Sequence, residues 1–136
     1  MQEHLPREHG LPRFFALRAE AAAPAGAAEL TAAYDEVATD YDEHWLSEAG
    51  GPVADLVERL GLRGDERVFE AGCGTGFATE RLCRALRAGG VVTSVDLSEG
   101  MLAVARSRLQ RAGVPPPVLV QGDALEELAR QRDLDL

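Results

Sequence analysis

The residues of this 136-residue chain whose types and spacing indicate chemistry are a set of glycines and a set of acids. Three glycines alternate within the stretch "VFEAGCGTGFATE" (68–80): Gly72, Gly74 and Gly76. Glycine has no side chain and readily adopts positive φ, so a glycine-rich turn lets the backbone approach a ligand closely. Each of three acids stands near the end of a short apolar segment: Glu70, Asp96 and Asp123. Because ionised carboxylates only accept hydrogen bonds, this set indicates a ligand rich in donors.

Alternating strands and helices must position these residues. Apolar segments predict strands at 67–72, 89–96 and 115–123, and "DLDL" (133–136) begins a fourth. Apolar residues at helical spacing predict helices at 77–88, 99–113 and 124–130, the second with Ser98 as its N-cap. Short connections between them are typical of right-handed crossovers. We therefore predict an α/β fold, a Rossmann-like doubly wound parallel sheet with helices on both faces, of which the N-terminal half (about three and a half strands) is present.

The residues before the sheet divide into an arm and a helical segment. Residues 1–28 show no sustained periodicity, and we expect a flexible N-terminal arm there, followed by one domain over 29–136. Five apolar residues then recur at helical spacing and predict one amphipathic helix or two short ones: Leu30, Tyr34, Val37, Tyr41 and Trp45. Gly50, Gly51 and Pro52 are expected to end this segment, and Pro52 to begin another helix that Gly61 ends.

Composition narrows the classes of function. The net charge of −9 argues against a nucleic-acid partner, because a nucleic-acid-binding face is basic. The chain has no lysine, which excludes a P-loop and a Schiff-base lysine. No apolar run approaches the roughly 18 residues of a membrane span. The two cysteines and three histidines have no metal-ligand spacing, so we expect a cytoplasmic protein with reduced thiols and no metal site.

The surroundings of the glycines distinguish between ligands. A dinucleotide turn that starts at Gly72 requires its third glycine at position 77, which is Phe77. Glu70, just before the turn, is an unfavourable neighbour for a pyrophosphate. Asp96 suits a ribose diol in either class of cofactor. An ammonium, a ribose and an exocyclic adenine amine, without phosphate, match three acceptor carboxylates, and S-adenosylmethionine carries all three groups.

The chain resembles class I S-adenosylmethionine-dependent methyltransferases of the small-molecule, ubiquinone-biosynthesis-like kind. Four stretches carry this resemblance in order: "YDEVATDYDEHW" (34–45), "VFEAGCGTGFAT" (68–79), "VVTSVDLSEGMLAVAR" (91–106) and "VLVQGDALEEL" (118–128). The resemblance implies that 29–136 is the N-terminal part of a methyltransferase domain with a small-molecule methyl acceptor. It identifies no catalytic base and leaves the acceptor and the oligomeric state open.

The resemblance also implies a set of contacts to S-adenosylmethionine. It assigns the amino-acid portion to the glycine turn and to Glu70, through a bridging water because the family usually has Asp there. It assigns the ribose to Asp96 and the adenine to four residues: Leu97, Met101, Asp123 and Ala124. Tyr34 and Tyr41 would cover the cofactor. Core packing is an equally good interpretation of these two tyrosines, because they lie on the apolar helical stripe.

Two alternatives remain open on the sequence. The chain stops inside its fourth predicted strand, so we expect the N-terminal portion of a longer protein or a truncated product. Such a product could be a catalytically inactive module that binds the cofactor or pairs with a partner through its open sheet edge. An NAD(P)-binding oxidoreductase is the weaker alternative, because Phe77 and Glu70 disfavour it.

Overall fold

The computed structural model describes residues 26–136, so most of the expected N-terminal arm lies outside the described residues. Two helices come first, α2 (Ala27–Val37) and α3 (Tyr41–Arg59), and α2 thus begins two residues before the domain boundary expected at 29. The remaining elements alternate: β1 (Arg67–Ala71), α4 (Phe77–Ala85), β2 (Val91–Asp96), α5 (Glu99–Ala112), β3 (Val118–Gln121) and α6 (Ala124–Leu128). Within this described part, no helix has both the length and the apolar composition to cross a membrane.

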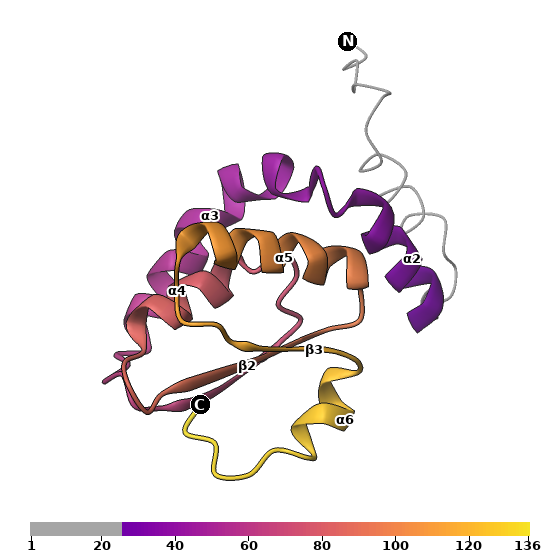
Figure 1. Ribbon diagram of the computed structural model, residues 1–136. Coiled ribbons are helices and arrows are strands. Elements are labelled where there is room, and N and C mark those ends of the chain that lie inside the picture. Colours follow the sequence, from indigo (N-terminus) through magenta and orange to yellow (C-terminus); the bar gives the residue numbers. More distant parts are fainter. Residues whose placement is uncertain (1–25) are drawn as a thin grey trace.

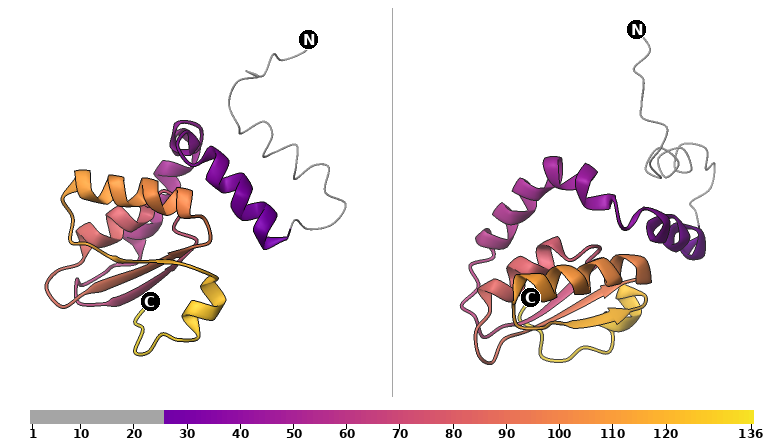
Figure 2. Two further views of the ribbon diagram at one scale, coloured as in Figure 1. Left: turned by 45° about the vertical axis from the view of Figure 1, so that its right-hand side comes forward. Right: turned by 45° about the horizontal axis from the view of Figure 1, so that its top comes forward.

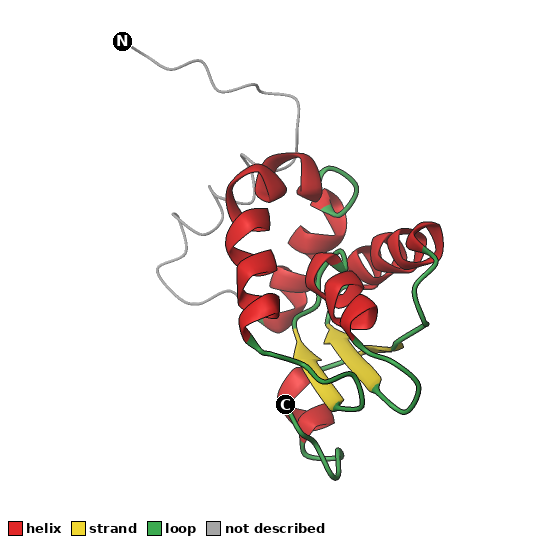
Figure 3. Ribbon diagram, turned by 90° about the vertical axis from the view of Figure 1, so that its left-hand side faces the viewer, coloured by secondary structure: helices red, strands yellow, loops and turns green. Residues whose placement is uncertain are grey.

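The three strands form a parallel sheet in the order β1-β2-β3 (Figure 1). Val68 pairs in register with Val92, and Thr93 with Val118. The two crossover helices, α4 and α5, lie on one face of the sheet, and the short helix α6 lies on the opposite face (Figures 1 and 2). Figure 3 shows the same separation from another side, with most helices above the strands. The predicted α/β fold with a parallel sheet and helices on both faces is therefore confirmed.

The end of the chain returns to the free edge of β1. The Phe69 N–H donates to the Leu136 carbonyl (2.8 Å), and the Leu136 N–H donates to the Arg67 carbonyl (3.4 Å). These bonds place the end of the chain beside β1 as in a parallel pair, but the structure forms no strand at 133–136, so this pairing is all that is seen of the predicted fourth strand. The chain thus passes from the β3 edge, through α6, to the opposite edge beside β1. The order of the strands reverses there, at the position where doubly wound sheets bind ligands.

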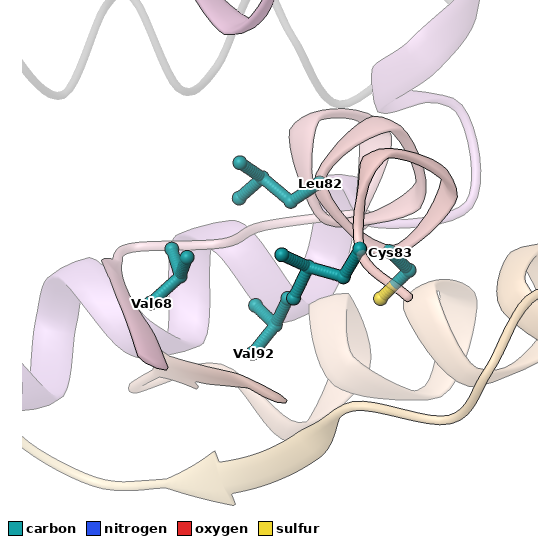
Figure 4. Close-up of a cluster of buried hydrophobic side chains, with 5 residues drawn as sticks. Val68, Leu82, Cys83 and Val92 are labelled. Carbon is teal, nitrogen blue, oxygen red and sulfur yellow. The ribbon is translucent and has the colours of Figure 1, made fainter. Parts of the chain in front are cut away.

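Two apolar clusters hold the helices in place. The first joins β1, β2 and α4 through Val68, Leu82, Cys83, Leu86 and Val92 (Figure 4). The second joins the end of α2 to α5, with buried Val37, Ala38 and Met101 at its centre. Leu30, Tyr34 and Tyr41 pack against this second cluster. As a result, α2 and the start of α3 are held beside the first turn of α5.

The prediction that Gly50, Gly51 and Pro52 end a helix is wrong, because α3 runs through all three. Gly50 is buried, and a Cβ built there would lie 3.3 Å from Cζ of Phe77. The glycine therefore allows α3 to pack closely against the start of α4, and this packing outweighs the low helix propensity of the segment. The preceding break at 38–40 agrees with the alternative of two helices.

Candidate cofactor-binding site

The three glycines of the turn after β1 serve two purposes. All three have left-handed backbone conformations, with φ of +68° at Gly72, +54° at Gly74 and +80° at Gly76. A Cβ built at Gly72 or Gly74 would meet nothing within 4 Å, whereas one at Gly76 would lie 2.9 Å from Cβ of Ala105. The first two glycines therefore face open space, and the third allows α4 to pack against α5.

Asp96 connects the glycine turn to the turn after β2. Its Oδ2 accepts from the Gly74 N–H (2.8 Å), and its Oδ1 accepts from the Ser98 N–H (2.9 Å). The turn is also held by the Val95 carbonyl, which accepts from the N–H groups of Gly72 (2.8 Å) and Cys73 (3.0 Å). A carboxylate offers about four acceptor sites, so Asp96 retains capacity for a ligand.

A cavity of about 330 Å³ lies at the carboxyl ends of the strands. It is bordered by the glycine turn, the segment from Val95 to Met101, the start of α6, α2 and the start of α3. Nine of the residues predicted from the sequence line it: Tyr34, Tyr41, Gly72, Gly74, Asp96, Leu97, Met101, Asp123 and Ala124. The structure thus brings together residues from five separate segments of the chain around one cavity.

Glu70 and Gly76 do not line the cavity. Glu70 pairs in register with Ser94, two residues before Asp96, so it lies about 6.6 Å below the rim. Its Oε2 accepts from Thr79 Oγ1 (2.6 Å) and Ser94 Oγ (2.7 Å). Glu70 therefore joins β1, β2 and α4 beneath the turn.

The environment of Glu70 favours its protonated form. Burial raises its pKa, and the nearby charge of Asp96 raises it further. The hydroxyl groups of Thr79 and Ser94 offset part of this shift, because they donate to the ionised form. Burial also raises the pKa of the neighbouring Cys73 thiol to about 12, with the charges of Glu70 and Asp96 adding to the effect. Cys73 is therefore a neutral thiol at physiological pH.

Asp123 uses one of its two carboxylate oxygens to cap a helix. Its Oδ1 accepts from the N–H groups of Leu125 (2.8 Å) and Glu126 (3.1 Å), which makes Asp123 the N-cap of α6. Its Oδ2 takes no hydrogen bond from any residue between 26 and 136. The N–H of Ala124 takes no part in this cap, and first-turn N–H groups have no partner inside a helix. An acceptor and a donor thus stand side by side at this end of the cavity.

Tyr34 and Tyr41 line the cavity from the side of the N-terminal helices. Their ring centroids are 6.1 Å apart, and Tyr41 is stacked on Trp45 at 5.8 Å. Burial raises the pKa of Tyr41, and the nearby Tyr34, Asp42 and Asp96 add to the shift. Both rings also pack against the cluster around Met101, so they belong to the core and to the cavity wall at once.

Six lining residues were not predicted from the sequence: Leu30, Thr31, Val95, Ser98, Gly122 and Leu125. Leu30 lies on the same helical stripe as the two tyrosines, and this shared stripe was a usable signal. Ser98, Gly122 and Leu125 lie within two residues of a predicted acid. Val95 directly precedes the predicted acid Asp96, whereas Thr31 carries no signal of its own, because many surface residues have the same character.

Comparison with known proteins agrees with this architecture. The family described as a methyltransferase domain matches residues 68–136, half of the chain. Trans-aconitate 2-methyltransferase of Delftia acidovorans is 39% identical over 68 residues, which are 50% of this chain and 25% of that protein. Demethylmenaquinone methyltransferase of Tropheryma whipplei is 32% identical over 95 residues, which are 62% of this chain and 36% of that protein.

Among solved structures, the O-methyltransferase TomG from Streptomyces achromogenes, determined in complex with SAM, shares the fold. Its TM-score is 0.56 at 23% identity, and the match covers 96% of this chain and 56% of TomG. The chain spans between 16% and 46% of the length of the first curated relatives that it matches. The resemblance to class I methyltransferases is confirmed by the family match, and the chain belongs to the methyltransferase domain family.

Proposed function

We propose that this chain binds S-adenosylmethionine in the cavity and forms the cofactor-binding part of a methyltransferase with a small-molecule acceptor. One observation carries the proposal: among the described residues, the cavity lining contains two carboxylates, Asp96 and Asp123, and no basic side chain. A dinucleotide carries a pyrophosphate, which this lining would repel, whereas S-adenosylmethionine carries a sulfonium and an ammonium. The open space beside Gly72 and Gly74 also fits a ligand that lies against the backbone.

The lining residues divide between the parts of the cofactor. Gly72 and Gly74 would hold the amino-acid portion against the turn, because a side chain at either position would fill that space. Asp96 would accept from the ribose hydroxyl groups with its remaining lone pairs. Leu97 and buried Met101 would pack against the adenine.

The adenine edge matches the start of α6. The exocyclic amine would donate to Oδ2 of Asp123, and a ring nitrogen would accept from the Ala124 N–H. Tyr34 and Tyr41 would cover the bound cofactor on the side of α2 and α3. The lining thus offers an acceptor or donor to each polar part of the nucleoside.

The chemistry in this proposal depends on positioning. When bound, S-adenosylmethionine would supply an activated methyl group on a sulfonium, and the residues that line the cavity would orient it. Glu70 stabilises the turn from below rather than contacting the reacting atoms, because it bonds to Thr79 and Ser94. The names of the trans-aconitate and demethylmenaquinone relatives specify small organic acceptors, and we propose the same class here.

Titration calorimetry tests this proposal. The chain is titrated in parallel with S-adenosylmethionine, S-adenosylhomocysteine and NADH. We expect binding of the first two with one site each and none of NADH. Binding of NADH alone would support the oxidoreductase alternative, and the absence of binding by all three would contradict the proposed cofactor.

A further inference from the structure

The segment over the cavity contains a repeated pair of residues that the proposed function does not explain. Tyr34–Asp35 and Tyr41–Asp42 are seven positions apart. The tyrosines line the cavity and the aspartates do not. We propose that Asp35 and Asp42 are positioning residues that fasten the two tyrosines over the cavity from opposite ends. The identity of the ligand in this proposal rests on the proposed function, whereas the contacts that fasten the two helices do not depend on it.

Asp42 fastens the first turn of α3 to the glycine turn. Its Oδ1 accepts from Thr75 Oγ1 (2.5 Å), and its Oδ2 pairs with Nη2 of Arg108. Arg108 also donates from Nε to the carbonyl of Thr75 (3.0 Å), which closes a three-residue ring of contacts. Thr75 is only 3% exposed and stands between Gly74 and Gly76.

The ion pair in this ring is shielded from solvent. The side chains of Arg108 and Asp42 are 17% and 24% exposed. Salt screens such a pair less than an exposed one, and its loss leaves Arg108 with one fewer acidic partner in a half-buried position. Asp42 directly follows Tyr41 in the first turn of α3, so the contacts of this aspartate hold in place the turn that carries the tyrosine.

Asp35 fastens α2 to the start of α5. Its Oδ1 accepts from Ser98 Oγ (2.5 Å) and from the Gly100 N–H (2.8 Å). Ser98 Oγ in turn accepts from the Met101 N–H (3.0 Å), so the contact extends the N-cap of α5. A Cβ built at Gly100 would lie 2.9 Å from Oδ1 and 3.0 Å from Cα of Asp35. The close approach of α2 to α5 therefore depends on a glycine at position 100.

The two aspartates act on different ends of the cavity. Asp42 holds the glycine turn, where the amino-acid portion of S-adenosylmethionine is proposed to lie. Asp35 holds the segment of Ser98 and Met101, which borders the proposed adenine site. Loss of Asp42 should therefore weaken the binding of S-adenosylmethionine more than the binding of adenosine. Loss of Asp35 should weaken the binding of both ligands. A purely structural role would not separate the two ligands in this way.

The binding experiment compares Asp42→Asn and Asp35→Ala with two control variants. Asp42→Asn is expected to raise the Kd of S-adenosylmethionine about tenfold and that of adenosine less than twofold. Asp35→Ala is expected to raise both about tenfold, and Asp35→Asn, which keeps an acceptor oxygen, to recover most of this loss. Glu43→Gln removes an exposed charge from the same turn of α3 and should change neither Kd more than twofold. Equal effects of Asp42→Asn on both ligands would overturn the separation of roles.

An experiment without ligand tests this proposal independently of the proposed function. Hydrogen exchange of the apo chain is expected to accelerate at least tenfold in residues 30–45 of Asp42→Asn and Asp35→Ala, with β1 and β2 unchanged. Trp45, the chain's single tryptophan, should change its emission because it is stacked on Tyr41. If this occurs while the wild type does not bind S-adenosylmethionine, the fastening stands and the proposed function fails.

Two results of the exchange experiment would overturn the fastening itself. One is unchanged exchange in residues 30–45, and the other is equal acceleration in β1 and β2. If Asp42→Asn does not fold, Thr75→Val replaces it, because it removes only the hydroxyl contact to Asp42 and keeps the Arg108 pair. The same exchange pattern is then expected in residues 40–45.

Discussion

At the scale of single residues, Asp96 has a position that no other acid of the described chain shares. It is the last residue of β2, and its two oxygens accept from the backbone of the two turns that border the cavity. A residue in this position both shapes the cavity and offers acceptors to what binds there. Its removal is therefore expected to affect the cavity and the two turns that border it directly.

We expect Asp96→Ala to weaken S-adenosylmethionine binding by about 1.5 kcal/mol or more, the range of a hydrogen bond to a charged group. Calorimetric titration of the variant measures this loss. Asp55→Ala is the matched control, because Asp55 is an exposed acid on α3 that does not line the cavity. An affinity of Asp96→Ala equal to that of the control would refute the ribose assignment.

Glu70 predicts a pH dependence of stability. Its folded-state pKa is raised, so between the unfolded and folded values the native state binds more protons than the unfolded state. The contribution of Glu70 to stability is therefore present at low pH and is lost as pH rises through the folded pKa. Glu70→Gln cannot ionise, so it abolishes this loss of stability with rising pH. The variant keeps an oxygen that accepts from Thr79 and Ser94.

Urea unfolding of the wild type and of Glu70→Gln at pH 4, 5.5 and 7 measures the effect. We expect the unfolding free energy of the variant, relative to the wild type, to rise with pH over this range. The comparison cancels the opposite slopes of Glu66 and Glu80, whose pKa values are lowered, because both are present in the two proteins. A relative stability that falls with pH would show that the carboxylate form of Glu70 is the stabilising one.

The three acids at the strand ends could be picked out from the sequence, but their different roles could not. Asp96 could be predicted because it ends a strand and begins a turn, and both features are local. Glu70 resembles it in sequence, yet the register places it beside Ser94, below the rim. Asp35 and Asp42 could not be predicted, because their partners Ser98 and Thr75 are 63 and 33 residues away in the chain.

At the scale of elements, the contact between α4 and α5 depends on Gly76, and the open space at the turn depends on Gly72. Gly76→Ala places a Cβ 2.9 Å from that of Ala105 at a φ of +80°, so strain and collision add. We expect a loss of more than about 2 kcal/mol of stability, since the left-handed backbone alone costs about 1–2 kcal/mol.

Gly72→Ala is the matched variant for this test. It has the same backbone strain but no neighbour within 4 Å, so we expect a loss of only about 1 kcal/mol. Its methyl group points into the space proposed for the cofactor, so S-adenosylmethionine binding should fall at least tenfold. Thermal unfolding and calorimetry measure the two effects, and equal destabilisation by the two variants would contradict the proposed role of Gly76.

The elements differ in how far local sequence could predict them. The strands β1 and β2 and the helix α5 follow from apolar periodicity and from the Ser98 cap, which act within a few residues. The course of α3 through Pro52 could not be predicted, because Gly50 is held by Phe77, 27 positions later in the sequence. Tertiary packing, and not local helix propensity, determines where such a helix ends.

At the scale of the whole molecule, the cavity lies where the topology of the sheet places a ligand. Successive strands extend from β1 to β3, and the chain then returns to the other side of β1. The carboxyl ends of β1 and β2 thus meet beside the switch point. In Figure 2, α2 lies beside α5, and Tyr34 of α2 and Tyr41 of α3 line the cavity there. The fold class and the place of the site follow from the alternation of strands and helices. The attachment of α2 and α3 beside the cavity depends instead on long-range contacts.

The most direct test of the central claim is hydrogen exchange of the chain with and without saturating S-adenosylhomocysteine. We predict protection in three segments, 72–74, 96–101 and 122–125, because these border the cavity. A second cavity, lined by Val57, Glu58, Gly61 and Arg84 between α3 and α4, serves as the internal control and should show no protection. Protection confined to this second cavity, or absent from the glycine turn, would contradict the assignment of the cofactor site.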